Sequence, residues 1–184
     1  MDTVGSRKEP SLLGFLVIMV IIVAGLIYFF VSMGTGDWLW FSPNFSATPS
    51  AMVVYCYGDK VQIEPGSGHF RAVSEILTSS LSGEKRWDSL SMSTETYEEY
   101  RTSPRAVAIE FFFPEAVRVH SRFKFFSNVD DLIIPLEGRH AITNPVFGRN
   151  AGITTAGSLH LDSIDPFGKY LSDQQICLLK GSSG

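Results

Sequence analysis

One uninterrupted apolar segment near the N-terminus constrains this chain more than any other feature. Residues 12–33 read LLGFLVIMVIIVAGLIYFFVSM and contain no Asp, Glu, Lys, Arg or His. A helix of this length, rising about 1.5 Å per residue, is roughly 33 Å long and matches a bilayer core of about 30 Å. In lipid, every backbone N–H and C=O of a single span must be hydrogen-bonded within it, which only a helix achieves. The sequence therefore predicts a transmembrane helix over residues 12–33.

The charges on the two sides of this segment predict its orientation. Arg7 and Lys8 precede it, whereas no Lys or Arg follows it until Lys60. Positively charged flanks stay in the cytoplasm, so we expect residues 1–11 to form a cytoplasmic tail. The C-terminal part is then extracytoplasmic, in a periplasm or outside the cell. A cleaved signal peptide is the alternative, but its apolar core is shorter and is followed by small residues. We therefore expect a single-pass anchor retained in the cell membrane.

The segment after the anchor reads as a juxtamembrane linker, residues 34–50, because it is rich in Gly, Pro, Ser and Thr. Its first half contains Trp38, Trp40 and Phe41. Aromatic side chains of this kind gather where a bilayer meets water. We expect these three to lie at the membrane interface. Residues 51–184 are then numerous enough for one domain with a core of its own.

Hydrophobic periodicity in the remainder predicts an α+β domain with a mostly antiparallel sheet and one or two helices. Apolar runs of strand length separated by turn residues predict strands, and apolar residues at helical spacing predict helices. We expect Pro114 to end a strand, residues 138–152 to form a long loop and residues 165–169 a turn. The expected strands are residues 51–57, 61–64, 106–113, 117–126, 132–136, 154–161 and 176–179, and the expected helices are residues 69–81 and 94–101.

The chain contains two cysteines, Cys56 and Cys177. In an extracytoplasmic space a disulfide between them can persist, and it would join the start of the domain to its end. Both cysteines also stand among apolar, strand-like residues, where free buried thiols are common. The sequence leaves both states open.

The clearest pattern in the domain is a strict alternation over residues 117–125. Side chains alternate between the two faces of a strand, so one face would be apolar and the other basic. The basic positions are Arg118, His120, Arg122 and Lys124. One interpretation is a solvated face paired with acids such as Glu110 or Asp130. The other is a docking stripe for an acidic partner or for anionic headgroups.

The sequence carries no recognisable catalytic, metal-binding or redox signature. Its four histidines are scattered, without the spacing of a local metal site. The adjacent acids Glu98–Glu99 and Asp130–Asp131 are typical of a solvated surface, because neighbouring side chains point apart. A net charge of −4 argues against a general nucleic-acid binder. We expect no cofactor and no enzymatic activity.

Together these features predict a non-catalytic accessory or structural subunit of a larger membrane-protein complex. The expected partners are the lipid bilayer and other membrane-protein subunits, and a respiratory or photosynthetic electron-transfer assembly is one such complex. An independent extracytoplasmic binding or sensor-regulatory domain is the alternative. No motif identifies a small-molecule ligand.

Overall fold

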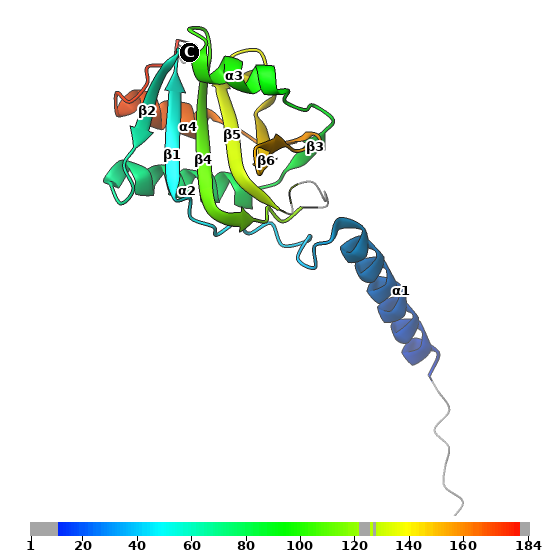
Figure 1. Ribbon diagram of the computed structural model, residues 1–184. Coiled ribbons are helices and arrows are strands. Elements are labelled where there is room, and N and C mark those ends of the chain that lie inside the picture. Colours follow the sequence, from blue (N-terminus) through cyan, green and yellow to red (C-terminus); the bar gives the residue numbers. More distant parts are fainter. Residues whose placement is uncertain (1–10, 122–125, 127, 181–184) are drawn as a thin grey trace, which may run out of the picture.

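The computed structural model describes residues 11–121, 126 and 128–180. Its first element is a long apolar helix, α1 (Leu12–Thr35), which extends away from the folded domain (Figure 1). The Ser11 side chain accepts a hydrogen bond from the Gly14 N–H at its start, and Gly36 ends it in a left-handed conformation (φ 67°). Within the described part of the chain, α1 is the one helix long and apolar enough to cross a membrane by length and composition.

The domain is built on one antiparallel sheet of eight strands, in the order β2-β1-β4-β5-β6-β8-β3, with β7 paired to β6. Every pairing between described strands is antiparallel, which confirms the expected α+β class with a mostly antiparallel sheet. The strands are β1 (Ala51–Cys56), β2 (Asp59–Ile63), β3 (Arg86–Asp88), β4 (Val107–Val117), β5 (Val129–Glu137), β6 (Pro145–Asn150), β7 (Ile153–Thr154) and β8 (Ser158–His160).

The two faces of the sheet are covered unequally. Helices α2 (Gly68–Ser82) and α4 (Asp165–Asp173) lie on one face, behind the sheet in Figure 1, and enclose the main core. Helix α3 (Thr94–Thr102) packs on the other face over a smaller core. Strand β4 serves both faces by alternation, since Ile109 belongs to the main core and Ala108 to the smaller one.

Two expectations near the C-terminus are wrong. Residues 165–169 are the start of helix α4, so the described part of the domain has three α-helices and not one or two. Pro166 occupies the first turn of that helix, a position where proline is favoured, and Phe167 and Leu171 are buried one turn apart. Residues 176–179 are not a strand.

Other differences concern the ends of β4 and the segment between β5 and β7. β4 continues past Pro114, where its pairing with β5 shifts register, and a bulge of this kind tolerates proline. β4 then ends at Val117, so residues 118–121 are not the expected strand. Within residues 138–152 the chain forms a 3-10 turn (Ala141–Thr143) and β6, so this segment is not a continuous loop.

Candidate functional site

The turn that follows α1, residues 36–41, folds back against the C-terminal end of the helix; we call it the juxtamembrane turn because α1 is the expected membrane anchor. The Tyr28 hydroxyl donates to the Trp38 carbonyl oxygen at 3.0 Å. The Tyr28 ring centroid lies 6.0 Å from those of both Trp38 and Phe41. Trp38 and Phe41 are still 53% and 58% exposed. The structure therefore gathers the three aromatics singled out by sequence around the end of the apolar helix, with Trp40 edge to face against Phe41 at 5.9 Å.

Asp37 joins this turn to the folded domain. It is 3% exposed, and its Oδ2 accepts a hydrogen bond at 3.0 Å from His120 Nδ1. Its Oδ1 accepts the backbone N–H of Leu39 at 2.9 Å and lies 3.8 Å from an Arg118 guanidinium nitrogen. The two described members of the predicted basic stripe, Arg118 and His120, thus converge on the juxtamembrane turn.

The acidic partners expected for the basic stripe are not the ones nearest to it, and two of its residues are not described. The acids proposed from sequence bond to other groups: Glu110 accepts from the Tyr55 and Tyr97 hydroxyls, and Asp130 accepts the backbone N–H of Ala151 at 2.8 Å. Arg122 and Lys124 lie outside the described residues.

The second half of residues 34–50 packs on the domain as well. Phe45 is 3% exposed and belongs to the main core. Its backbone N–H donates to the Ser82 hydroxyl at 2.9 Å, and its ring meets Phe113 edge to face at 6.1 Å. The segment is therefore attached to α1 at one end and to the core at the other.

Replacing Asp37 by Ala is expected to loosen the juxtamembrane turn. The change removes the acceptor for the Leu39 N–H and for His120, and a hydrogen bond to a charged group is worth roughly 1.5–3 kcal/mol. The Leu39 amide should therefore exchange hydrogen about tenfold faster or more, measured by mass spectrometry on the full chain in mild detergent. Asp59→Ala, at an exposed position in β2, is the matched control. Unchanged exchange at Leu39 in the Asp37 variant would contradict the attachment.

A pocket of about 600 Å³ opens beside the juxtamembrane turn; we call it the membrane-proximal pocket. Trp40 and Phe41 line it from the turn, and His120 lines it from the segment after β4. Lys85, Arg86 and Trp87 line it from the end of α2 and from β3. Aromatic and basic side chains therefore surround one hollow at the end of the domain nearest α1.

The described residues also contain a buried acid cluster under α3, on the other face of the sheet. Glu110 is fully buried and Asp131 is 6% exposed, although the sequence predicted a solvated Asp131. The Tyr55 hydroxyl donates to Glu110 Oε2 at 2.7 Å, and the Tyr97 hydroxyl donates to Oε1. Arg149 donates to Asp131 Oδ2 at 2.9 Å and lies 3.8 Å from Glu110 Oε1.

Electrostatics within the cluster favour a protonated Asp131. Burial, followed by the nearby charge of Glu110, raises the pKa of Asp131 to about 8, and Arg149 opposes this shift. Burial and Glu110 also raise the pKa of Tyr97. Because the two carboxyls are almost completely covered, we assign the cluster to the structure of the domain and not to chemistry on a solute.

Because the pKa of Asp131 is raised in the folded state, this residue stabilises the fold more at low pH than at high pH. The folded state holds a proton on Asp131 that the unfolded chain releases above its ordinary pKa of 3.8. The contribution to stability is therefore fully present below about pH 4 and is lost as the pH rises to about 8. Asp131→Asn is expected to flatten this part of the profile, measured as urea midpoints at a series of pH values. Parallel profiles for the two proteins would show that Asp131 is not the group responsible.

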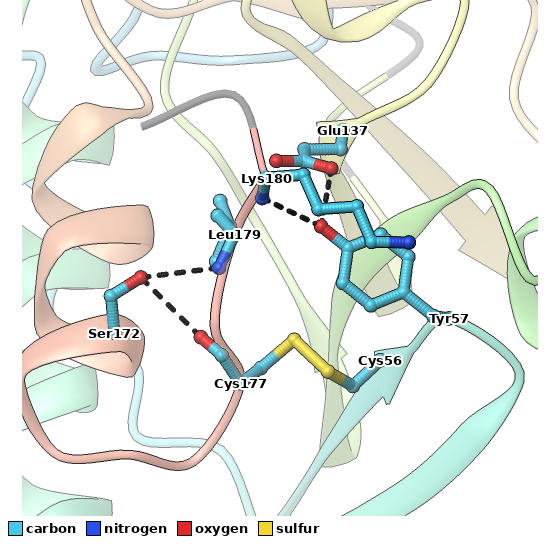
Figure 2. The surroundings of a disulfide bond; sticks show 7 residues. All are labelled: Cys56, Tyr57, Glu137, Ser172, Cys177, Leu179 and Lys180. Carbon is cyan, nitrogen blue, oxygen red and sulfur yellow. Dashed lines mark hydrogen bonds between the residues drawn. A yellow bond between two sulfur atoms is a disulfide. The ribbon is translucent and has the colours of Figure 1, made fainter. Parts of the chain in front are cut away.

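A disulfide joins Cys56, at the end of β1, to Cys177, after α4, with sulfurs 2.02 Å apart. Figure 2 shows the polar contacts that accompany it. The Tyr57 hydroxyl donates to Glu137 Oε2 at 2.6 Å and accepts the Lys180 N–H at 2.8 Å. Burial and Glu137 raise the pKa of Tyr57 to about 12. The structure therefore contains the bridged alternative, and it holds residues 177–180 against β1.

The four histidines have separate surroundings. His69 bonds Tyr170, His120 bonds Asp37, His140 bonds Tyr100 and His160 bonds Ser158. Among the residues the structure describes, no group of three or more His, Cys, Asp or Glu side chains is arranged to hold a metal ion.

The Ser67 hydroxyl caps α2 by accepting the Phe70 N–H at 3.1 Å, an ordinary role for a residue at this position.

The roles of Asp37 and Glu110 were missed from sequence. Glu110 had a recognisable signal, since it is the one charged residue in the apolar run AVAIEFFF. Asp37 had none, because its partners lie 81 and 83 positions away and no pattern links them.

Comparisons of the chain with protein-family models, curated proteins and solved structures find no match.

Proposed function

We propose that this chain is a single-pass, membrane-anchored, non-catalytic accessory subunit of a larger membrane-protein complex and carries no cofactor. The observation that carries the proposal is the attachment of the domain to the end of the apolar helix. Asp37 contacts Arg118 and His120 of the domain, while its neighbour Trp38 packs on Tyr28 of the helix. A domain held in this way presents a fixed surface to proteins in the same membrane.

Two further features support the proposal. Arg7 and Lys8 precede the helix and favour an extracytoplasmic domain, a location in which the Cys56–Cys177 disulfide persists. The acid cluster of Glu110 and Asp131 is almost completely covered from solvent, which suits a structural role. Trp38 and Phe41 remain more than half exposed and offer contact area to a transmembrane neighbour as well as to lipid.

Purification in mild detergent tests this proposal. An affinity tag can be added at the C-terminus, because the last described residue, Lys180, bonds Tyr57 after the end of β1, and the linker from α1 enters β1 at its opposite end. We expect the full chain to migrate on a native gel within a stable complex much larger than itself. Visible absorbance of that complex would identify a respiratory or photosynthetic assembly. Migration as a free monomer would refute the subunit proposal.

A matched pair of variants localises the contact. Replacing both Trp38 and Phe41 by Ser removes exposed aromatics beside the helix, and we expect the complex to dissociate. Ile142→Ser removes an apolar side chain that is 90% exposed, in the turn after β5, and should leave the complex intact. Loss of the complex in both variants, or in neither, would refute a contact at the juxtamembrane turn.

An extracytoplasmic binding or sensor-regulatory domain is the second candidate. The membrane-proximal pocket of about 600 Å³ favours it, because this volume lies within the range of ligand sites. A free monomer on the native gel that binds a small solute in this pocket would support this alternative.

A further inference from the structure

The membrane-proximal pocket combines two features that a lipid headgroup site needs. Its aromatic side, Trp40 and Phe41, belongs to the turn that packs on α1, and Phe41 lies 6.0 Å from Tyr28 of that helix, centroid to centroid. If α1 spans the bilayer, this side of the pocket lies at the depth of the headgroups, which extend about 5–7 Å beyond the hydrocarbon core.

The opposite side of the pocket supplies hydrogen-bond donors and positive charge. Lys85 Nζ donates to the carbonyl oxygens of Leu81 and Gly83. An ammonium group has three N–H donors, so one remains for a ligand. Arg86 is exposed and its guanidinium suits phosphate. Burial lowers the pKa of Lys85, and a bound anion would oppose that shift.

Trp40, one of the residues that line the pocket, carries an unsatisfied polar group. Trp40 Nε1 is buried and has no hydrogen-bond partner within the described part of the chain. Buried donors in native structures are rarely left unpaired, so each one calls for an explanation. An oxygen-rich group in the pocket that Trp40 lines would supply the missing acceptor.

The acids around the pocket are few and mostly engaged. Asp37 is bonded to His120, and the charge of Asp162 acts on Lys85. Glu84, which is exposed, is the one acidic residue among the described residues that line the pocket. Lys85 and Arg86 thus outnumber it, and the local charge favours an anion.

From these observations we propose that the membrane-proximal pocket binds the phosphate headgroup of an anionic phospholipid from the extracytoplasmic leaflet. The inference rests on the anchored topology of the proposed function, and it adds a specific lipid to the partners. Lys85 and Arg86 would bind the phosphate, Trp40 would donate from its indole, and the acyl chains would lie along α1. The bound lipid would hold the domain against the membrane at a second point.

Tryptophan fluorescence reports on this pocket and on the end of α1 next to it. The chain has three tryptophans. Trp40 and Trp87 line the pocket, and Trp38 packs on the adjoining end of α1. The full chain is reconstituted in phosphatidylcholine vesicles that contain a small, equal mole fraction of either brominated phosphatidylglycerol or brominated phosphatidylcholine. Bromine on the acyl chains quenches tryptophans that a bound lipid touches.

We expect brominated phosphatidylglycerol to quench more strongly, with an association constant roughly thirtyfold above that of phosphatidylcholine, from about a factor of five for each cation at the membrane surface. Lys85→Ala with Arg86→Ala should abolish this preference. Lys60→Ala with Arg105→Ala removes two exposed cations elsewhere on the domain and should retain it. Circular dichroism of each variant verifies that the fold is intact.

The outcomes separate this inference from the proposed function. A chain that fails to float with the vesicles overturns the anchor and this inference together. A chain that floats but is quenched equally by both lipids overturns the headgroup site alone, as does a preference that survives loss of Lys85 and Arg86. Millimolar inorganic phosphate that removes the preference would identify a free-phosphate site and would also overturn the lipid assignment.

Discussion

Replacing Arg149 by Met is expected to lower the free energy of unfolding by about 3–5 kcal/mol. The Arg149 guanidinium lies 2.9 Å from Asp131 and 3.8 Å from Glu110, and it covers the Tyr97 ring at 3.7 Å. Its side chain is only 15% exposed. Without it, the fully buried Glu110 carboxylate loses its positive partner where water cannot replace it. Urea denaturation of the full chain in mild detergent, followed by circular dichroism, measures the loss.

A control variant and a triple variant test whether the lost charge pairing is the cause. Arg101 also lies over the Tyr97 ring, at 5.2 Å, but its side chain is 34% exposed, so Arg101→Met should cost about 1 kcal/mol. Combining Arg149→Met with Glu110→Gln and Asp131→Asn removes both acids, and we expect much of the stability to return. An Arg149→Met protein as stable as the parent, or no recovery in the triple variant, would show that charge pairing does not hold this cluster.

Replacing Cys56 and Cys177 together by Ser is expected to cost about 2–5 kcal/mol. The bridge closes a loop over a sequence separation of 121, and a long loop loses more freedom when it is closed in the unfolded chain. The urea midpoint of the full chain should fall accordingly. A reducing agent should lower the midpoint of the parent and leave that of the Ser variant unchanged. Equal midpoints for all four samples would contradict a stabilising bridge.

Features encoded by local sequence could be predicted. The apolar helix, α2, α3 and the first hairpin are short-range patterns, and the structure contains each of them within a few residues of the expected bounds. Two of the wrong predictions, the strand end at Pro114 and the turn at residues 165–169, rested on a proline. Pro114 lies at a bulge and Pro166 in the first turn of a helix, two positions that tolerate proline. The sequence alone does not show which role a given proline has.

The candidate site depended on long-range contacts that sequence patterns do not contain. The alternation of residues 117–120 correctly separated Val119, which is buried, from Arg118 and His120, which face Asp37. It did not reveal that partner, because nothing local to Asp37 marks it. The membrane-proximal pocket likewise requires residues 40–43, 83–87 and 120–121 to meet in space, which the order of elements does not predict.

The disulfide also determines how the domain would carry mechanical tension. A pull between the membrane and a partner on the C-terminal tail would pass through α1 and β1 to Cys56, cross the covalent bridge to Cys177 and leave through residues 178–180. Residues 57–176 lie outside this path. β1 is hydrogen-bonded along its length to β2 and β4, but both of these strands lie off the path, so the load would not shear those bonds. With the bridge intact, the domain would transmit force while the enclosed chain stayed unstretched.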